Sequence, residues 1–272
     1  MLAIRKQLRS FRRGRVRVAN ELRSQRRIRD NLERSVARKL TSLFPKFVRT
    51  EADKFLASTM FNESEAIRGL QSELFPVMAR HYKRVFSTMY AFNEGRYEDM
   101  HKSVDVPVFG RNRDIEGLIL LYNENRQLFL SSVSAGIAAK VAKVITEGRV
   151  ESLSLAQIAK NITTKVGAIS RSRAMLVART ETHNAASYAN HQYHGSLGQE
   201  LGMTMVKRWT STQDLRTRSF HAEANGQTVS MDEPFIVGGV PMMYAGDPQG
   251  GAKNVVNCRC VIVYVDAADQ VD

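Results

Sequence analysis

Cysteine is scarce in this sequence: the 272 residues contain only Cys258 and Cys260, close to the C-terminal end. Two cysteines cannot build a disulfide framework, which excludes small disulfide-stapled secreted scaffolds and favours synthesis in a reducing compartment. No uninterrupted run of eighteen apolar residues occurs, and arginines divide the apolar stretches near the N-terminus. We therefore expect neither a transmembrane helix nor a signal peptide.

Acidic residues are scarce in one segment only, the first 49 residues. Sixteen Lys and Arg residues stand there against Glu21, Asp30 and Glu33, an excess of +13 that equals the net charge of the whole chain. The remaining residues are therefore neutral overall. Aromatic residues are also sparse, with Phe11 alone among the N-terminal arginines, which disfavours base stacking on single strands. A segment of this composition indicates a polyanionic partner.

The apolar residues of 1–49 recur mostly at helical spacing, which predicts one long basic amphipathic helix with a break near Gly14 and an end at Pro45. Its basic face can be merely solvated, or can contact DNA phosphates, an acidic protein or an anionic membrane surface. We expect double-stranded DNA, bound without sequence preference. The residues predicted to contact the polyanion are Arg5, Lys6, Arg9, Arg12, Arg13, Arg15, Arg17, Arg23, Arg26, Arg27 and Arg29.

The middle of the chain, 50–169, is predicted to be helical. The pattern gives two helices hinged at Pro76, a loop over 103–114, and a further apolar helix up to Gly148. Ser154 is expected to cap a short helix that Gly167 closes.

The last part, 170–272, begins with a long helix to Gly195. After this helix, β-branched and aromatic residues occur in rough alternation. This alternation predicts a strand at 203–212, a hairpin turning at Gly238 and Gly239, and a last strand that begins at the cysteines. The predicted fold class is α+β, with a mostly helical N-terminal two-thirds and a small C-terminal β-containing module docked on a long helix. The expected parts are a basic arm (1–49), a helical region (50–169) and the module (170–272).

The cysteine pair has four interpretations. With His221, and with Asp214 or His183 as a fourth ligand, Cys258 and Cys260 offer a zinc site. Alternatively they form a C-x-C disulfide, or Cys258 is a nucleophile with His221 as its base. The plainest interpretation is that both pack as small core residues beside the 170–195 helix, so that the protein needs no cofactor, with zinc as the alternative.

The long helix also carries His183, His191 and His194, of which the last two share a face. Such a cluster can bind a metal or act as a pH switch, although histidines that cap a core are commoner. Six further polar positions predict a structural clamp, an ion-pair network that holds the helix to the β unit. The same groups can instead hold a phosphate or an oxyanion. These positions are Arg179, Glu181, Asp214, Arg216, Arg218 and His221.

Taken together, "ARTE" on a helix, then "RW", "D-x-R-T-R-x-x-H", "DEPF", a Gly-rich stretch and a terminal "NCRC" resemble the Mu F-like minor head proteins of tailed phages, the phage head morphogenesis family. The resemblance covers about 170–265. One departure is "GGAKNVVNCRC", which lacks the Pro and His that usually precede the cysteines. The matching positions are Ala178, Arg179, Thr180, Glu181, Trp209, Asp214, Arg216, Arg218, His221, Gly226, Asp232, Pro234, Phe235, Asn257, Cys258, Arg259 and Cys260.

The resemblance implies a non-enzymatic minor capsid protein, made in the host cytoplasm and carried in the virion near the portal vertex. Its implied partners are the portal protein, capsid or scaffold proteins and the packaged DNA, with roles in head assembly, genome packaging or genome ejection. The alternative is a phage-encoded metal-dependent nuclease or hydrolase that uses His221, Asp214 and the cysteine pair. A third hypothesis is a free DNA-binding protein of the host.

Overall fold

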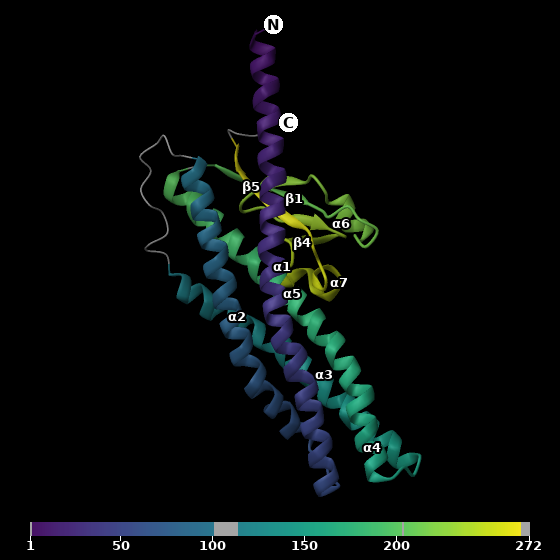
Figure 1. Cartoon of the computed structure of the whole chain (residues 1–272). Helices are drawn as coiled ribbons and strands as arrows, with labels where there is room; N and C mark the ends of the chain where they lie inside the picture. Colours follow the sequence, from purple (N-terminus) through teal and green to yellow (C-terminus); the bar gives the residue numbers. More distant parts are fainter. Residues whose placement is uncertain (1, 101–113, 203, 268–272) are drawn as a thin grey trace. The chain divides into compact units, whose positions relative to one another are not determined.

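The computed structural model (Figure 1) describes residues 2–100, 114–202 and 204–267, and for residues 2–18, 97–100 and 201 it describes the backbone alone. It divides into two compact units. Unit 1 comprises Met1–Asn31, Val85–Arg113 and Thr180–Asp272, and unit 2 comprises Leu32–Arg84 and Asp114–Arg179. The division of the chain into parts at 49 and 169 stays a prediction, because each unit here draws on separate stretches of the chain.

Helices form most of the described chain, and they are α1 (Leu2–Ser58), α2 (Glu63–Met100), α3 (Ile115–Val150), α4 (Leu155–Asn161), α5 (Gly167–Leu201), α6 (Ser219–Glu223) and α7 (Gly251–Val255). Five residues of π-helix (Ile162–Val166) join α4 to α5, and a 3-10 turn (Pro248–Gly250) precedes α7. The strands are β1 (Met205–Thr210), β2 (Thr228–Ser230), β3 (Phe235–Val237), β4 (Val240–Met242) and β5 (Val261–Asp266). The α+β fold class, helical first and β-containing last, is confirmed.

Two prolines predicted to end or hinge helices do neither. α1 continues through Pro45 to Ser58, and α2 continues through Pro76. A proline inside a helix costs about 3 kcal/mol. Buried side chains at helical spacing lie on both sides of each proline, such as Phe44 and Val48 around the first, and their burial offsets that cost. α1 is likewise unbroken at Gly14.

α3 contains, by composition, a stretch apolar enough to cross a membrane, with a mean hydropathy of 1.6 over its most apolar window. The composition of α3 therefore does not support the expectation, drawn from the sequence, that no helix could span a membrane. Core helices of soluble proteins pass the same test. In unit 2, α3 buries Tyr122, Leu130 and Ile137, and Tyr122 packs edge-on against Tyr82 of α2. α3 therefore has one face in the core of unit 2, although only 39% of its most apolar window is buried and Leu128 is 84% exposed.

The predicted cap at Ser154 is confirmed. Its side chain accepts a hydrogen bond from the Gln157 backbone, and the Gln157 side chain accepts one in return from the Ser154 backbone. Gly167, expected to close this helix, instead begins α5. The intervening π-turn keeps the backbone helical, so the short helix runs on into the long one.

The strands form a three-stranded antiparallel sheet in the order β2–β1–β5 and a separate β3–β4 hairpin. β1 alternates between buried and less buried positions, as its sequence predicted, whereas the first four residues of β5 are all buried. The hairpin turns at Gly238 and Gly239, both at positive φ (59° and 77°), the conformation that two-residue hairpin turns require.

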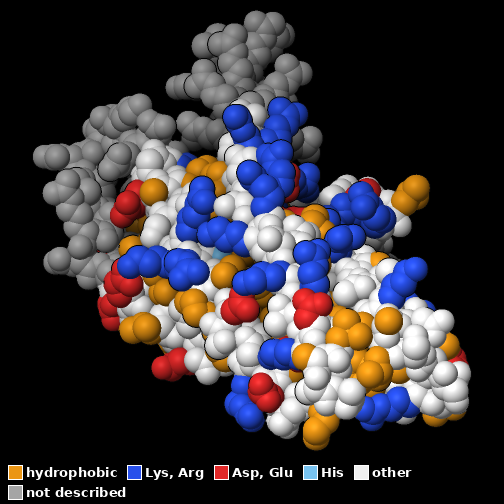
Figure 2. Space-filling model, turned by 60° about the horizontal axis from the view of Figure 1, so that its bottom comes forward, with side chains coloured by type: hydrophobic (Ala, Val, Ile, Leu, Met, Phe, Trp, Pro, Cys, Tyr) orange, Lys and Arg blue, Asp and Glu red, His pale blue; other side chains and the backbone are white. Residues whose placement is uncertain are grey.

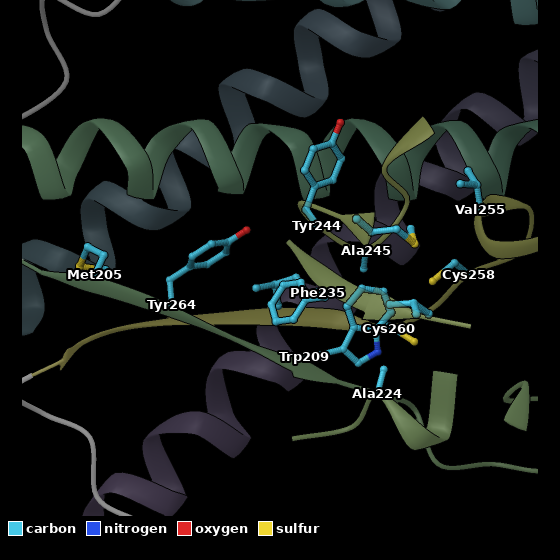
Figure 3. Close-up of a cluster of buried hydrophobic side chains, with 13 residues drawn as sticks. Met205, Trp209, Ala224, Phe235, Tyr244, Ala245, Val255, Cys258, Cys260 and Tyr264 are labelled. Atoms are coloured by element: carbon cyan, nitrogen blue, oxygen red, sulfur yellow. The ribbon is translucent and has the colours of Figure 1, made fainter. Parts of the chain in front are cut away.

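One apolar cluster fills the space between the sheet and the hairpin (Figure 3). Its largest member is the fully buried Trp209, which lies edge-on to Phe235 at 5.4 Å between ring centroids. Cys258 and Cys260 belong to the same cluster, and Figure 3 shows both sulfur atoms at its end near Trp209. Tyr188 of α5 packs against Tyr244 and places the helix along this cluster, as the docked-module prediction required.

Candidate functional site

Helix α6 and the loop before β5 bring one histidine and both cysteines together. His221 Nδ1 lies 3.3 Å from Cys260 Sγ and 3.7 Å from Cys258 Sγ. The three residues are each only 2% exposed, and both thiols are free. Their donor atoms all lie within 4.8 Å of one another, which in the described part of the chain makes this group the one set of His, Cys, Asp and Glu side chains spaced to hold a metal ion.

Two further groups complete this site, which we call the Cys–His cluster: His221, Cys258 and Cys260 with His183 and Arg29 around them. His183 of α5 is buried and interacts with Cys258. An Arg29 guanidinium nitrogen lies 2.7 Å from His183 Nδ1 and 3.5 Å from the Cys260 carbonyl oxygen. Because Arg29 can only donate, His183 Nδ1 accepts and its proton resides on Nε2.

The two thiols have opposite pKa shifts. A hydrogen bond with Cys260, reinforced by His183 and His221, holds the pKa of Cys258 well below its ordinary value. The same hydrogen bond, together with burial, raises the pKa of Cys260. Burial lowers the pKa of Arg29 to about 10, so the guanidinium stays charged near neutral pH. The arrangement favours one thiolate beside a fixed positive charge.

Arg29 therefore does not lie on the predicted polyanion-binding face. It is half-buried and continues the inward-facing stripe of α1, in which Leu22, Gln25, Arg29, Leu32 and Val36 follow one another three or four residues apart. This spacing was the signal in the sequence, because a polar residue on the buried stripe of a helix needs an internal partner. Arg23 and Arg27 are exposed and Arg26 is half-buried. The side chains of Arg5, Lys6, Arg9, Arg12, Arg13, Arg15 and Arg17 lie outside the described residues.

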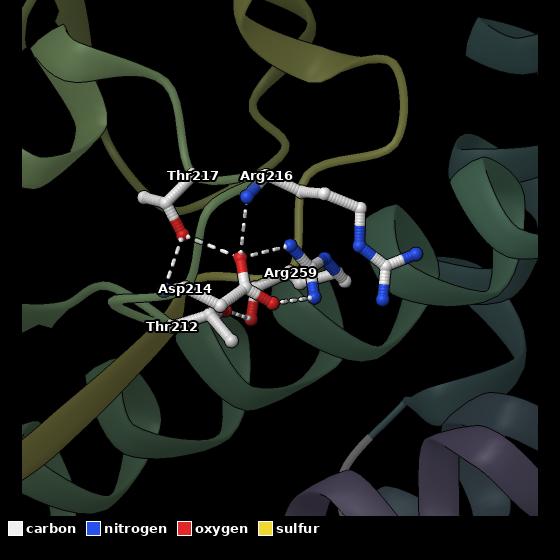
Figure 4. A network of polar contacts seen from close by, with 5 residues as sticks. All are labelled: Thr212, Asp214, Arg216, Thr217 and Arg259. Carbon is white, nitrogen blue, oxygen red and sulfur yellow. Dashed lines mark hydrogen bonds and ion pairs between the residues drawn. The ribbon is translucent and has the colours of Figure 1, made fainter.

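The predicted clamp residues occupy several different places. Asp214 forms a two-pronged ion pair with Arg259, at 2.5 and 2.7 Å (Figure 4), and accepts hydrogen bonds from Thr217 and the Arg216 backbone. These contacts, that with Arg259 first, hold the pKa of Asp214 well below its usual range and raise the pKa of Arg259. Arg218 donates to the Val256 carbonyl at 2.6 Å. These contacts join the 211–221 segment to the 256–260 segment.

The helical members of the predicted clamp have other surroundings. Arg179 pairs with Glu33 of α1 at 3.2 Å within unit 2, and the Arg216 side chain is exposed. Glu181 is fully buried. On α5, the link to the cysteine segment is instead Thr180, whose hydroxyl accepts a hydrogen bond from the Asn257 backbone at 3.3 Å.

A buried polar network in unit 1 was not predicted from the sequence. Gln25 donates to Glu21 at 3.0 Å and accepts from Asn190 of α5 at 3.2 Å, and Asn93 of α2 donates to Asn190 at 2.9 Å. Arg96 of α2 holds both oxygens of Glu21 at 2.7 Å. The network joins three helices through hydrogen bonds between residues that are 75 to 165 positions apart in the sequence. Local sequence patterns cannot predict pairs that far apart.

The three histidines of α5 have separate partners. His183 faces the cysteines, His191 packs against Tyr244, and His194 stacks on Tyr264 with ring centroids 4.3 Å apart. They do not converge on a shared site within the described residues.

His191 gives a pH prediction. Burial, with Lys207 nearby, lowers its pKa to about 4. As the pH falls below about 6.5, the unfolded chain takes up a proton that the folded state refuses until about pH 4. Stability is therefore lost across this window, by about 3 kcal/mol for this residue at pH 4. We expect His191→Phe, which keeps the ring, to lose less stability than the parent chain between pH 6.5 and 4 in urea unfolding; an unchanged pH dependence would contradict this.

Basic side chains gather on the face shown in Figure 2, where Lys and Arg are more abundant than Asp and Glu. In unit 1 the described side chains of α1 include exposed Arg23 and Arg27, and those outside the helix include exposed Arg208, Arg216 and Lys253. The basic character of the N-terminal segment therefore reaches the surface at least at its described end.

One region of this chain matches known proteins. Residues 137–263 match the model for phage Mu protein F-like proteins. A 127-residue stretch is 31% identical to the "Minor head protein GP7" of Bacillus phage SPP1, covering 46% of this chain and 40% of that protein. A 133-residue stretch is 34% identical to the "NAD(+)--arginine ADP-ribosyltransferase EFV" of Enterococcus faecalis, covering 47% of this chain and 26% of that protein.

These matches span well under half the length of either relative. No solved structure matches this chain. The matched region, 137–263, contains the whole Cys–His cluster except Arg29, together with the Asp214–Arg259 ion pair. The resemblance expected from the sequence is thereby confirmed, and the matched region extends further towards the N-terminus than expected.

Proposed function

Because residues 137–263 belong to the phage Mu protein F-like family, we propose that this chain is a minor head protein that is incorporated into the virion near the portal and contacts packaged DNA. The match of residues 137–263 to this family is the main evidence for this function. It is supported by the relative from phage SPP1, whose name describes a minor head protein. Virion assembly would then involve portal, capsid or scaffold proteins as partners.

The charge distribution supports the DNA contact independently of the family. The whole net charge of +13 lies in residues 1–49, all of which precede the matched region, and residues 2–49 lie on one continuous helix. Arg23 and Arg27 are exposed at the described end of that segment. A straight helix rich in arginine can lie along phosphates and release counterions, which gives affinity without sequence preference.

A metal-dependent hydrolase is the less favoured function. That hypothesis needs Asp214 beside His221 and the cysteines, yet Asp214 is exposed and held by Arg259, and it is not among the clustered donors. A transferase activity is not proposed either. The relative with that name shares about a quarter of its length with this chain, over a stretch about as long as the one shared with the minor head protein.

The DNA contact is tested by fluorescence anisotropy with a short double-stranded oligonucleotide of random sequence at 50 and 200 mM salt. If the arm makes about 6–10 phosphate contacts, affinity should fall by about 10³–10⁵ between these concentrations. Replacing the seven basic residues of the first turns with Gln should weaken binding strongly at low salt and flatten the salt dependence. These residues are Arg5, Lys6, Arg9, Arg12, Arg13, Arg15 and Arg17.

The control removes the same charge elsewhere, from seven exposed basic residues of unit 2. Binding of this variant should stay much closer to that of the parent, with a similar salt slope. Equal losses in the two variants would show that only net charge matters, and no measurable binding by the parent chain would refute the DNA contact. The control positions are Arg68, Arg80, Lys140, Lys143, Lys160, Lys165 and Arg171, all outside the basic arm.

A further inference from the structure

We propose that His221, Cys258 and Cys260 form a zinc site, in which His221 Nδ1 and the two sulfur atoms are three ligands of a tetrahedral ion, a water molecule takes the fourth position, and His183 with Arg29 supports the ligands from outside. The site is separate from the proposed DNA contact and does not depend on it. It would join the α6 segment to the loop that leads into β5.

The distances match those of a zinc site. Zinc bonds of about 2.3 Å to sulfur and about 2.0 Å to nitrogen place neighbouring ligand atoms of a tetrahedral site about 3.5–3.8 Å apart. The nitrogen-to-sulfur distances here are 3.3 and 3.7 Å. Ordinary packing of apolar residues does not require two thiols to converge on one imidazole nitrogen in a buried position.

The local backbone brings both sulfurs to the same side. Asn257 takes a positive φ of 58°, which asparagine tolerates, and turns the chain immediately before Cys258. Cys258 and Cys260 are two residues apart at the entry to β5, and residues at this spacing in extended chain share a face. The two cysteines thus present their sulfur atoms on the same side of the chain and can act together as a bidentate ligand.

The two ligand-bearing segments are held together by contacts that need no metal. Arg218 donates to the Val256 carbonyl, Thr212 donates to the Arg259 carbonyl at 3.2 Å, and Arg259 pairs with Asp214. The predicted clamp residues therefore fix the ligands relative to one another. Ligands positioned in this way lose little freedom when an ion binds.

His183 and Arg29 fit the role of supporting groups. With Nδ1 accepting from Arg29, His183 carries its proton on Nε2, so it can donate to a thiolate but cannot ligate through that nitrogen. The buried Nε2 has no hydrogen-bond partner among the described residues, and His183 interacts with Cys258, so this donor is available to a thiolate there. The positive Arg29 stabilises a site that contains two thiolates.

The short elements around the site suggest that a bound zinc ion would stabilise this part of the fold. β2, β3 and β4 are three residues each, and α6 and α7 are five residues each. Elements this short contribute little stability by themselves, and small loop-rich modules commonly depend on a metal or a disulfide. The C-terminal part of unit 1 has one well-filled apolar cluster, and the proposed site lies at its edge.

The test uses the full chain, purified under reducing conditions, stripped with a chelator and titrated with Zn²⁺ against a chromophoric competitor. We expect one ion per chain, with binding raising the melting temperature and protecting both thiols from alkylation. Co²⁺ in place of Zn²⁺ should give a thiolate-to-metal charge-transfer band. A chain with two free thiols that binds no Zn²⁺, or one whose thiols are joined as a disulfide after purification without oxidant, would overturn the proposal.

Variants separate ligands from supporting groups. Cys258→Ser and Cys260→Ser should each abolish stoichiometric binding, whereas His183→Gln, which keeps a donor, should weaken it by about 10–100-fold. Asp232→Asn, at an exposed carboxylate that belongs neither to the Cys–His cluster nor to the clamp, should leave binding unchanged and serves as the control. Loss in His183→Gln as complete as in the serine variants would refute the three-ligand assignment. Thiol protection in the parent chain decides the question even if a serine variant fails to fold.

Discussion

Replacing Trp209 with alanine is expected to destabilise the protein by about 3–5 kcal/mol. Trp209 is fully buried and lies edge-on to both Phe235, at 5.4 Å, and His221, at 5.7 Å. Its removal leaves a cavity between β1 and the hairpin, because a close-packed core relaxes only partly around a lost ring. Urea unfolding followed by circular dichroism measures the loss.

Two controls make the Trp209 prediction specific. Trp209→Phe keeps an aromatic ring and should cost clearly less than the alanine variant. Leu215→Ala, at a side chain that is fully exposed, should change stability very little. If Trp209→Ala unfolds with the parent's midpoint and slope, this cluster is not the core of the C-terminal part of unit 1.

Replacing Arg96 with methionine should destabilise the protein by about 3–5 kcal/mol, because it leaves the buried Glu21 carboxylate without its charged partner. Glu21 is 4% exposed, and both of its oxygens lie 2.7 Å from the Arg96 guanidinium. Burial already raises the pKa of Glu21, while Arg96 opposes that shift. Without Arg96 the folded state should bind a proton more tightly than the unfolded chain does. The deficit should therefore grow as the pH rises from about 4.5.

The double variant Glu21→Met with Arg96→Met is the matched control. It removes both charges, so it should recover most of the stability that Arg96→Met loses. The measurement is the unfolding free energy of the parent, both single variants and the double variant at pH 5 and pH 8. Additive losses without any recovery would show that the two side chains are not coupled, contrary to the described geometry.

The sequence was most informative where structure is local. Helical spacing, the Ser154 cap, the strand alternation of 205–210 and the two glycines of the hairpin all correctly predicted their elements. The errors at Pro45 and Pro76 have one cause, which is that tertiary packing along a long helix outweighs a local penalty. The prediction that Gly167 ends the short helix was wrong for a related reason, since the chain continues through a π-turn into α5.

The site was less predictable, because its members come from distant segments. Cys258, Cys260 and His221 were grouped by residue type alone; the structure does bring them together, but their proximity rests on the pairing of β1 with β5. Arg29 was assigned to the surface although it follows the buried stripe of α1. Gly246 gave no sequence signal at all. Gly246 takes a positive φ of 88°, and a Cβ there would lie 2.4 Å from the Asn184 side-chain oxygen, so both the backbone conformation and the close approach to α5 favour glycine.

Quantitative mass spectrometry of purified, DNA-filled phage particles tests most directly whether this chain is a minor head protein. The particles are taken from cells in which the phage carrying this gene is propagated, and an empty-procapsid fraction is compared with them. The proposal predicts that the chain is present in filled particles in far fewer copies than the major capsid protein, and that it can be cross-linked to the portal. Absence from the particles, although the protein is made during infection, would contradict the virion role.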